Sequence, residues 1–282
     1  MVGEITFSDV ATFDSIDSKV FLDEYYKPLK PVVLKKLSHS WPAVNKWTPE
    51  FFQERHGNKQ VKVYDASFVE AGENYMSNAS TIPLKNYIEQ VMSSSQDLRM
   101  FLYNIKSEIP ELVEDINFPN LIKNISKNFV FMFFGCKGSI TQMHFDIDMS
   151  HVFHTVIRGK RTIYLFPFNE SKNLHRYPFT CRSYVDVENP DYERFPGLKS
   201  ANGYKVQLEA GDMLYIPSGY WHHFVYDEAG YSVSLRSASQ TVKGKLQGAY
   251  NLLIMQSIDR LLNKLSPQLW FHWKEQQALK VS

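Results

Sequence analysis

The sequence predicts a mainly β protein with flanking helices, in which the strands form a double-stranded β-helix, or jelly roll. Eight short runs rich in β-branched and aromatic residues follow one another from residue 128, turn residues separate them, and helical periodicity returns beyond residue 240. The chain has 282 residues, of which 44% are hydrophobic, so it is long for one domain but short for two. We therefore expect one compact unit with three segments, at residues 1–127, 128–240 and 241–282.

The first segment, residues 1–127, is predicted to be an α+β region that packs on the barrel. A helix is expected at residues 18–26 and a strand at residues 30–34. Thr48 and Pro49 begin another helix, because threonine is a good N-cap and proline fits the first helical position. Further along, strands are expected at residues 60–66 and 100–105, with a helix at about 83–92 between them.

The second segment, residues 128–240, carries the runs that predict the barrel. The runs end at glycine-containing turns, such as residues 135–138 and 209–212. The expected strands are residues 129–134, 139–146, 151–157, 162–166, 204–208, 213–216, 221–226 and 231–235. The interval 169–203 is polar and longer than the other connections, so we expect it to lie beside the mouth of the barrel.

The third segment, residues 241–282, is predicted to be helical. One apolar stripe consists of Leu246, Tyr250, Leu253, Ile254, Ile258, Leu261 and Leu265. Ser266 and Pro267 then begin a second helix, with Ser266 as its cap. We expect these helices to pack on the chain's own barrel, and a homodimer interface through them is the alternative.

Charge and cysteine content exclude several classes of protein. The chain has 31 Lys and Arg against 30 Asp and Glu, a net charge of +1, so no global field attracts nucleic acid or an anionic membrane, although a local basic patch remains open. Residues 1–6 show no signal-peptide pattern, and no apolar run approaches a membrane span. Cys136 and Cys181 form no zinc-type spacing and no disulfide framework. We therefore expect a soluble cytoplasmic protein.

A pattern of metal ligands lies in the second predicted barrel strand. His144 and Asp146 are two residues apart, so an extended strand directs both side chains to one face. A histidine from a distant strand would complete a set of two imidazoles and one carboxylate, the facial arrangement of non-haem iron sites. The triplet alone is weak evidence, because roughly one accidental match is expected in two such chains.

Two histidines compete for the third ligand position. His222 and His223 follow a proline turn within residues 209–223. Because they are adjacent in a predicted strand, they point to opposite faces, and only one can reach the barrel interior. For either residue taken alone, an ordinary packed histidine is the more common outcome.

Residues 129–237 resemble the JmjC and cupin-like hydroxylases. Thr141, His144 and Asp146 match the pattern Thr-x-x-His-x-Asp, residues 159–167 match a block that begins with glycine and ends in Leu-Phe-Pro, and residues 211–222 match a block that begins with Gly-Asp and ends in Trp-His. The similarity is greater to the branch with the tRNA wybutosine hydroxylase and the asparaginyl hydroxylase that inhibits hypoxia-inducible factor than to histone demethylases.

The resemblance implies an iron(II)- and 2-oxoglutarate-dependent hydroxylase that uses O2 and holds the metal with His144, Asp146 and His222. His222 is chosen over His223 because the ligand of the family directly follows the tryptophan. The substrate would be a peptide, a modified nucleoside or a small molecule, with a protein side chain expected first by analogy alone.

The resemblance also implies residues that bind 2-oxoglutarate. Thr141 stands where the family has a threonine that contacts the far carboxylate, but Arg161 replaces the lysine that binds it. A guanidinium can bind a carboxylate through two hydrogen bonds, so Arg161 can serve the same purpose. Lys160 is the alternative, although strand alternation turns it to the other face.

Four further polar residues lie close to these blocks. His154 and His151 are in the next predicted strand, where a fourth metal ligand, a hydrogen bond to 2-oxoglutarate and ordinary packing all remain open. Asp148 is expected beyond the mouth, where it could meet the substrate, and Arg236 has no assigned role.

Two other classes of function remain open. The change from lysine to Arg161 is compatible with a metal-binding cupin enzyme that does not use 2-oxoglutarate, and a non-catalytic barrel that only binds is the third reading. The long polar interval offers contacts to any of these substrates through Tyr177, Arg182, Tyr184, Tyr192 and Arg194.

Overall fold

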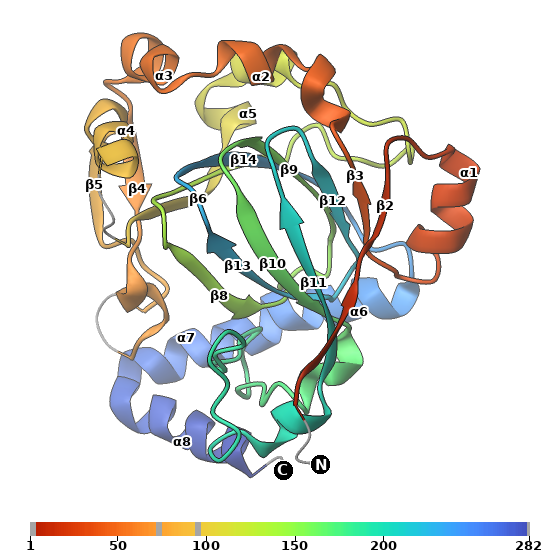
Figure 1. Cartoon of the computed structure of the whole chain (residues 1–282). Helices are drawn as coiled ribbons and strands as arrows, with labels where there is room; N and C mark the ends of the chain where they lie inside the picture. The colour runs from red at the N-terminus through yellow and green to blue at the C-terminus, as the bar shows by residue number, and fades with distance from the viewer. Residues whose placement is uncertain (1–3, 72–74, 94–96, 281–282) are drawn as a thin grey trace.

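Two β-sheets face each other at the centre of the molecule, with helices above and below them (Figure 1). The computed structural model describes residues 4–71, 75–93 and 97–280, so the first three residues of the opening segment lie outside it. The first sheet has the order β1 (Thr6–Asp9), β11 (Asn202–Leu208), β10 (Arg161–Phe166), β13 (Trp221–Tyr226), β8 (Ile140–His144). The second has the order β2 (Ala11–Phe13), β3 (Val32–Leu34), β12 (Met213–Ile216), β9 (His151–Arg158), β14 (Gly230–Ser237), β7 (Val130–Gly135), β6 (Arg99–Asn104). This is the predicted double-stranded β-helix.

Each of the predicted barrel strands is present within two residues of its expected bounds. The sequence analysis missed β1 and β2, which pair in parallel with β11 and β3 at the sheet edges. A separate pair, β4 (Gln60–Val63) and β5 (Ser80–Pro83), replaces the longer strand expected at residues 60–66. That prediction was wrong beyond Val63, because the Asp65 carboxylate accepts from the Ser67 amide and begins a short 3₁₀ turn.

The helices of the first segment cover the second sheet. They are α1 (Ser18–Val20), continued by the π-helical turn η1 (Phe21–Tyr26), α2 (Pro42–Lys46), α3 (Pro49–His56), α4 (Leu84–Ser93) and α5 (Ile105–Glu108). The Thr48 side chain caps α3 as predicted, accepting from the Phe51 amide. Short 3₁₀ turns are η2 (Leu37–Ser40), η3 (Ala66–Val69), η4 (Pro110–Asp115), η5 (Phe168–Ser171) and η6 (Pro196–Ser200).

The interior between the two sheets is apolar at one end. Val156 of β9, Ile163 of β10 and Leu214 of β12 are each fully buried there, and alternate residues of these strands point to the same space. This packed end supports the part of the barrel where polar side chains replace the aliphatic ones.

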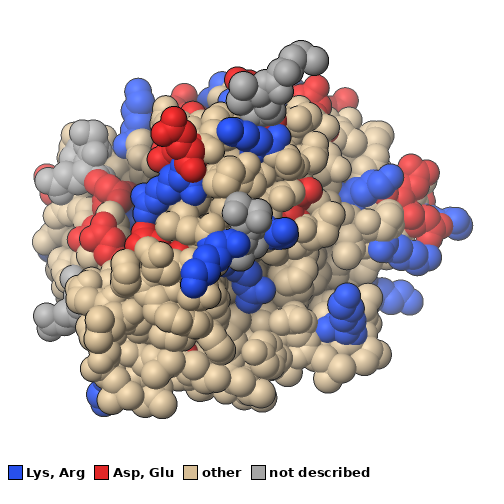
Figure 2. All heavy atoms as spheres, turned by 90° about the horizontal axis from the view of Figure 1, so that it is seen from below, with Lys and Arg blue, Asp and Glu red and all other residues tan. Residues whose placement is uncertain are grey.

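The C-terminal helices lie beneath the barrel (Figure 1) and comprise α6 (Val242–Tyr250), the π-helical turn η7 (Asn251–Met255), α7 (Gln256–Leu265) and α8 (Pro267–Leu279). These helices contact the barrel as expected, but not through their apolar stripe. Leu253, Leu261 and Leu265 are 57–73% exposed, and Figure 2, which views this side, shows a broad area without charged side chains. Ser266 also makes no capping hydrogen bond through its side chain.

A stripe of small and polar residues faces the barrel instead. Gly244, Gly248, Asn251, Met255 and Asp259 recur every three or four residues and are all buried. A Cβ atom at Gly248 would lie 2.5 Å from the carbonyl oxygen of Asp148, so only glycine permits this approach. The helix therefore docks through close backbone contact, which leaves its apolar stripe uncovered within the described residues.

Two polar contacts fix this helix pair to the rest of the chain. The Asn251 side chain, presented by the π turn η7, donates to the carbonyl of Ile147 at 3.0 Å. Asp259 accepts from Lys274 at 2.6 Å, from Tyr75 at 2.7 Å and from Trp270 at 2.8 Å, and the Asp259 and Lys274 side chains are 9% and 1% exposed. Among the described residues, no helix has the length and apolar character needed to cross a bilayer.

Candidate metal centre and its cavity

Three side chains with metal-binding atoms converge inside the barrel. His144 ends β8 and lies directly opposite His222 of β13 in the antiparallel register. Their ring centroids are 4.2 Å apart, and one ligand atom from each of His144, Asp146 and His222 lies within 4.8 Å of the others. These are the three residues selected from the sequence.

The route by which His144 and Asp146 meet differs from the predicted one. The strand ends at His144, so Asp146 follows it rather than alternating within it. The pairing of β8 with β13 also shifts register between His222 and Phe224, so that Gln142 and Met143 of β8 oppose His223 alone and form a bulge in β8. The ligands therefore gather at an irregular strand end, where a bulge redirects side chains.

Backbone carbonyls fix the orientation of both imidazoles. The Nδ1 atom of His144 lies 2.8 Å from the Gln142 carbonyl, and Nδ1 of His222 lies 3.0 Å from the Tyr220 carbonyl. A carbonyl can only accept, so each Nδ1 carries the proton and each Nε2 keeps a lone pair for a cation. Burial lowers the pKa of both histidines, and the neighbouring His222 adds to the effect on His144, so both rings are neutral.

Arg236 holds the carboxylate of the set. Its Nη2 donates to Oδ1 of Asp146 at 2.7 Å, and its Nη1 lies 3.3 Å from Asp148. Burial acts to raise the pKa of Asp146, but Arg236 and the two imidazoles outweigh it and hold the pKa below its ordinary value. Arg236, which had no assigned role in the sequence analysis, thus orients a candidate ligand and also pairs with Asp148.

His223 occupies the opposite face of β13. It is buried beside the ring of Tyr164, and neither ring nitrogen has a hydrogen-bond partner within the described part of the chain. It therefore lies away from the other two candidate ligands.

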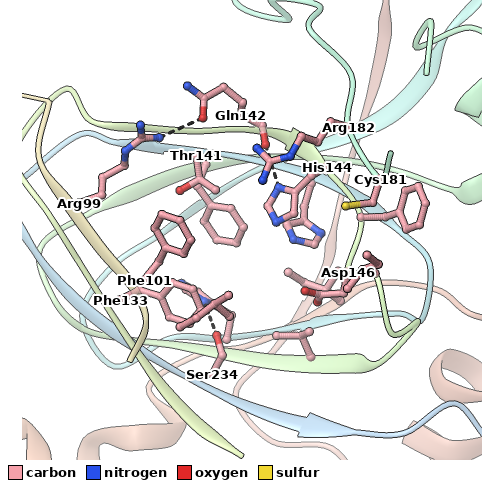
Figure 3. A pocket seen from close by; sticks show the side chains of 18 of the residues that line it. Arg99, Phe101, Phe133, Thr141, Gln142, His144, Asp146, Cys181, Arg182 and Ser234 are labelled. Carbon is pink, nitrogen blue, oxygen red and sulfur yellow. Dashed lines mark hydrogen bonds between the residues drawn. The ribbon is translucent and has the colours of Figure 1, made fainter. Parts of the chain in front are cut away.

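A cavity of about 220 Å³ opens from the three ligands. Its lining is mostly aromatic and aliphatic, with Thr141 and His154 among the polar exceptions. Figure 3 shows Thr141 on one side of His144, with Asp146 and Cys181 on the other. His154 bonds Ser234 through Nδ1 at 2.9 Å, and its Nε2 is buried without a partner in the described residues. A ligand in the cavity can supply that partner.

Arg161 and Lys160 do not line this cavity. Arg161 is fully buried, its guanidinium lies 3.8 Å from the centre of the Tyr226 ring, and it donates to the Glu228 carbonyl. Tyr226 lines the cavity, so Arg161 adjoins it only through this ring. Lys160 precedes β10, so strand alternation does not apply to it, and it pairs with Glu209 at 3.1 Å outside the cavity.

A cation that the sequence analysis missed lies at the cavity instead. Arg99, the first residue of β6, is 3% exposed and donates to the Ile140 carbonyl and, at 3.0 Å, to Gln142 (Figure 3). Its Nε is buried without a partner among the described residues. Arg99 is remote in sequence from the matched blocks and follows no periodic pattern, so only the pairing of β6 with β7 reveals its position.

Most of the other polar residues that the sequence analysis placed near the site contact other parts of the protein instead. His151 does not line the cavity; its Nδ1 lies 2.8 Å from the Tyr215 hydroxyl, and its ring stacks on Tyr26. Of the five residues offered by the interval 169–203, only Arg182 lines the cavity. The others bind elsewhere in the protein: Tyr177 and Tyr184 pack on Phe271, Tyr192 accepts from the Ile5 amide, and Arg194 pairs with Glu275.

Comparison with known proteins identifies the family of this chain. The family model described as a cupin-like domain matches residues 17–237. The chain belongs to the cupin-like family. The match covers the barrel and most of the first segment, and it confirms the expected relationship to the JmjC and cupin-like 2-oxoglutarate oxygenases.

Individual relatives of this cupin-like chain carry several names. It is 24% identical to the chicken tRNA wybutosine-synthesizing protein 5, over 80% of this chain and 76% of that one. It is 29% identical to lysine-specific demethylase 8 of Xenopus tropicalis and 31% identical to JmjC domain-containing protein D of Dictyostelium discoideum. The matches cover 76% and 72% of this chain but only about half of those two proteins.

Family membership supports an oxygenase that depends on iron(II) and 2-oxoglutarate. Two neutral imidazoles and one carboxylate, with a cavity beside them, are the donor set that suits iron(II) with open coordination positions. The residues present therefore fit the metal that the family implies.

Proposed function

We propose that this protein is an iron(II)- and 2-oxoglutarate-dependent hydroxylase acting on a C–H bond of a protein side chain, a modified nucleoside or a small molecule. The observation that supports it is the convergence of His144, Asp146 and His222 at a cavity, with both Nε2 atoms available to a cation. Iron(II) with 2-oxoglutarate would supply the activation of O2.

The chain's own residues would position the reactants. The carbonyls of Gln142 and Tyr220 hold the two imidazole rings, and Arg236 fixes one oxygen of Asp146 so that the other remains for the metal. The apolar lining keeps bulk water from the reacting atoms.

We further propose that Thr141 and Arg99 bind the far carboxylate of 2-oxoglutarate, with His154 contributing a hydrogen bond. Arg99 and Thr141 both line the cavity, whereas Arg161 would act through Tyr226, whose ring it contacts from behind. Arg99 is buried at the cavity wall, and its paired carboxylate, Asp97, lies 3.4 Å away with its side chain 41% exposed, so an anion in the cavity would give the guanidinium a second, buried counter-charge.

The co-substrate proposal predicts that Arg99→Leu weakens 2-oxoglutarate binding by about 10- to 100-fold, the loss of one charge-assisted hydrogen bond. The measurement is an anaerobic titration of iron(II) protein with 2-oxoglutarate, followed by the visible charge-transfer band. Lys160→Gln serves as the matched control and should leave the titration unchanged, since Lys160 pairs with Glu209 outside the cavity. Absence of the band from the unaltered protein would favour a cupin enzyme that does not use 2-oxoglutarate.

The uncovered apolar stripe supports a homodimer through the C-terminal helices. Leu253, Leu261 and Leu265 are each more than half exposed, and contiguous apolar area of this kind commonly marks an interface. Leu253→Glu combined with Leu261→Glu should convert the dimer to a monomer, as measured by size-exclusion chromatography with light scattering. Phe129→Glu is the control and should leave the dimer intact, because Phe129 is 54% exposed but lies outside the C-terminal helices. An unaltered protein that is monomeric at all concentrations would contradict this proposal.

The cytoplasmic location expected from the sequence stays a prediction.

A further inference from the structure

We infer that the substrate is carried on a single-stranded nucleic acid whose phosphates bind a cationic track, defined by Arg182, Gln256, Arg260, Asn263 and Lys264, leading from the cavity along one face of α7. The chemistry at the cavity rests on the proposed function. The track itself rests on separate observations of side chains outside the metal centre.

The two hollows along the proposed track are neighbours, because one residue lines both of them. Met76 lines both the cavity at the metal ligands and a second, shallow hollow bordered by Arg260, Asn263 and Lys264. Gln256 lines the first hollow. Spacings of four, seven and eight residues from Gln256 place these side chains on one face of the helix, so they form a single path outward from the mouth.

The cations of the track have no acidic partner in the described part of the chain. No carboxylate lies within 4.0 Å of Arg182, Arg260 or Lys264 there, whereas Arg194, Arg236 and Lys274 are all paired. Arg182 is held by the ring of Phe68 at 4.6 Å and by the sulfur of Met76 at 3.2 Å. Neither contact neutralises the guanidinium, so its charge remains available to an anion.

The charge is local to this part of the chain. Residues 241–282 contain six Lys and Arg against two Asp and Glu, although the whole protein has a net charge of only +1. Lys274 and Asp259 neutralise each other in the interior, so the exposed part of the segment is strongly positive. This is the local basic patch that the overall charge left open.

The type of side chain favours nucleic acid over an acidic peptide. Arginine, lysine, glutamine and asparagine are the residues that commonly contact phosphate oxygens. Phe68 and Phe101 also line the cavity, where their rings meet edge to face at a centroid distance of 4.9 Å and Arg182 lies over the Phe68 ring. Aromatic rings beside cations are common in sites that bind a single strand, whereas an acidic peptide needs only the cations.

The test is fluorescence anisotropy of a short labelled single-stranded RNA at several salt concentrations. Three phosphate contacts should give a slope of log affinity against log salt of about −2, and Arg260→Gln with Lys264→Gln should reduce it to about −0.7. The same double variant should weaken binding about 10-fold or more at low salt. Lys243→Gln with Lys245→Gln removes two exposed cations of α6 that do not line either hollow, and it should leave the slope unchanged.

Several results would overturn the inference. These are salt-independent RNA binding, equal loss in both double variants, or tighter binding of a poly-glutamate peptide that depends on Arg260 and Lys264. The anaerobic charge-transfer band tests the proposed function separately from this inference. If RNA bound with the expected slope but the band were absent, the hydroxylase proposal would be rejected and the phosphate-binding track would be retained.

Discussion

Asp146→Ala is expected to abolish iron-dependent consumption of 2-oxoglutarate while leaving the fold intact. Changes to residues that merely orient a metal ligand cost about 10- to 100-fold, so loss of a ligand should cost at least about 100-fold. The side chain lies just after β8, and the strand pairing of His144 with His222 does not depend on it. The measurements are succinate release, iron content of the purified protein, and circular dichroism.

His223→Ala is the matched control for this experiment. It removes an imidazole from the same strand as His222, but on the opposite face, beside Tyr164. Iron content and turnover should survive this change. If Asp146→Ala retained normal turnover, or if His223→Ala and His222→Ala lost iron equally, the assignment of the metal ligands would be wrong.

Asp259→Ala should lower the free energy of unfolding by about 3–5 kcal/mol, because it leaves the buried ammonium of Lys274 without its counter-charge. The same carboxylate accepts from Tyr75 and Trp270, so two further donors lose their partner. Burial already lowers the pKa of Lys274, while Asp259 acts to raise it. Without Asp259, the lysine should deprotonate more readily, which limits the loss at high pH.

Urea unfolding measures this effect, with Glu275→Ala as the control. Glu275 pairs with Arg194, whose side chain is 51% exposed, and such surface pairs contribute about 0–1 kcal/mol. Equal destabilisation by the two variants would show that the Asp259 cluster is not the anchor of the helix pair. A smaller loss in Asp259→Leu with Lys274→Met than in Asp259→Ala would show that the unpaired charge dominates.

The barrel and its three candidate ligands could be predicted from sequence because local signals specify them. Strands such as β12 and β13 have clear turn residues at both ends, and a histidine after tryptophan is a feature of one short block. Strand alternation also separated His222 from His223. Each of these inferences concerns neighbours in the chain.

Contacts between distant segments could not be predicted. Arg99 reaches the cavity only because β6 joins the edge of the second sheet, and Arg236 meets Asp146 across the barrel. The apolar stripe of the C-terminal helices did not identify the face that contacts the barrel, because periodicity shows that a face is apolar but not what covers it. Close packing through Gly248 depends on a backbone 100 residues away in sequence, that of Asp148.

The π turn η7 between α6 and α7 sets the rotational orientation of α7 about its axis relative to α6. One residue corresponds to about 100° of helical rotation, so a chain shortened by one residue within Asn251–Met255 would swing α7 by about a quarter turn relative to α6. Arg260 and Lys264 would then turn away from the hollow beside Met76, while Gly244 and Gly248 would keep their close packing contacts. A single deletion could thus change which surface adjoins the mouth without altering any side chain of the barrel.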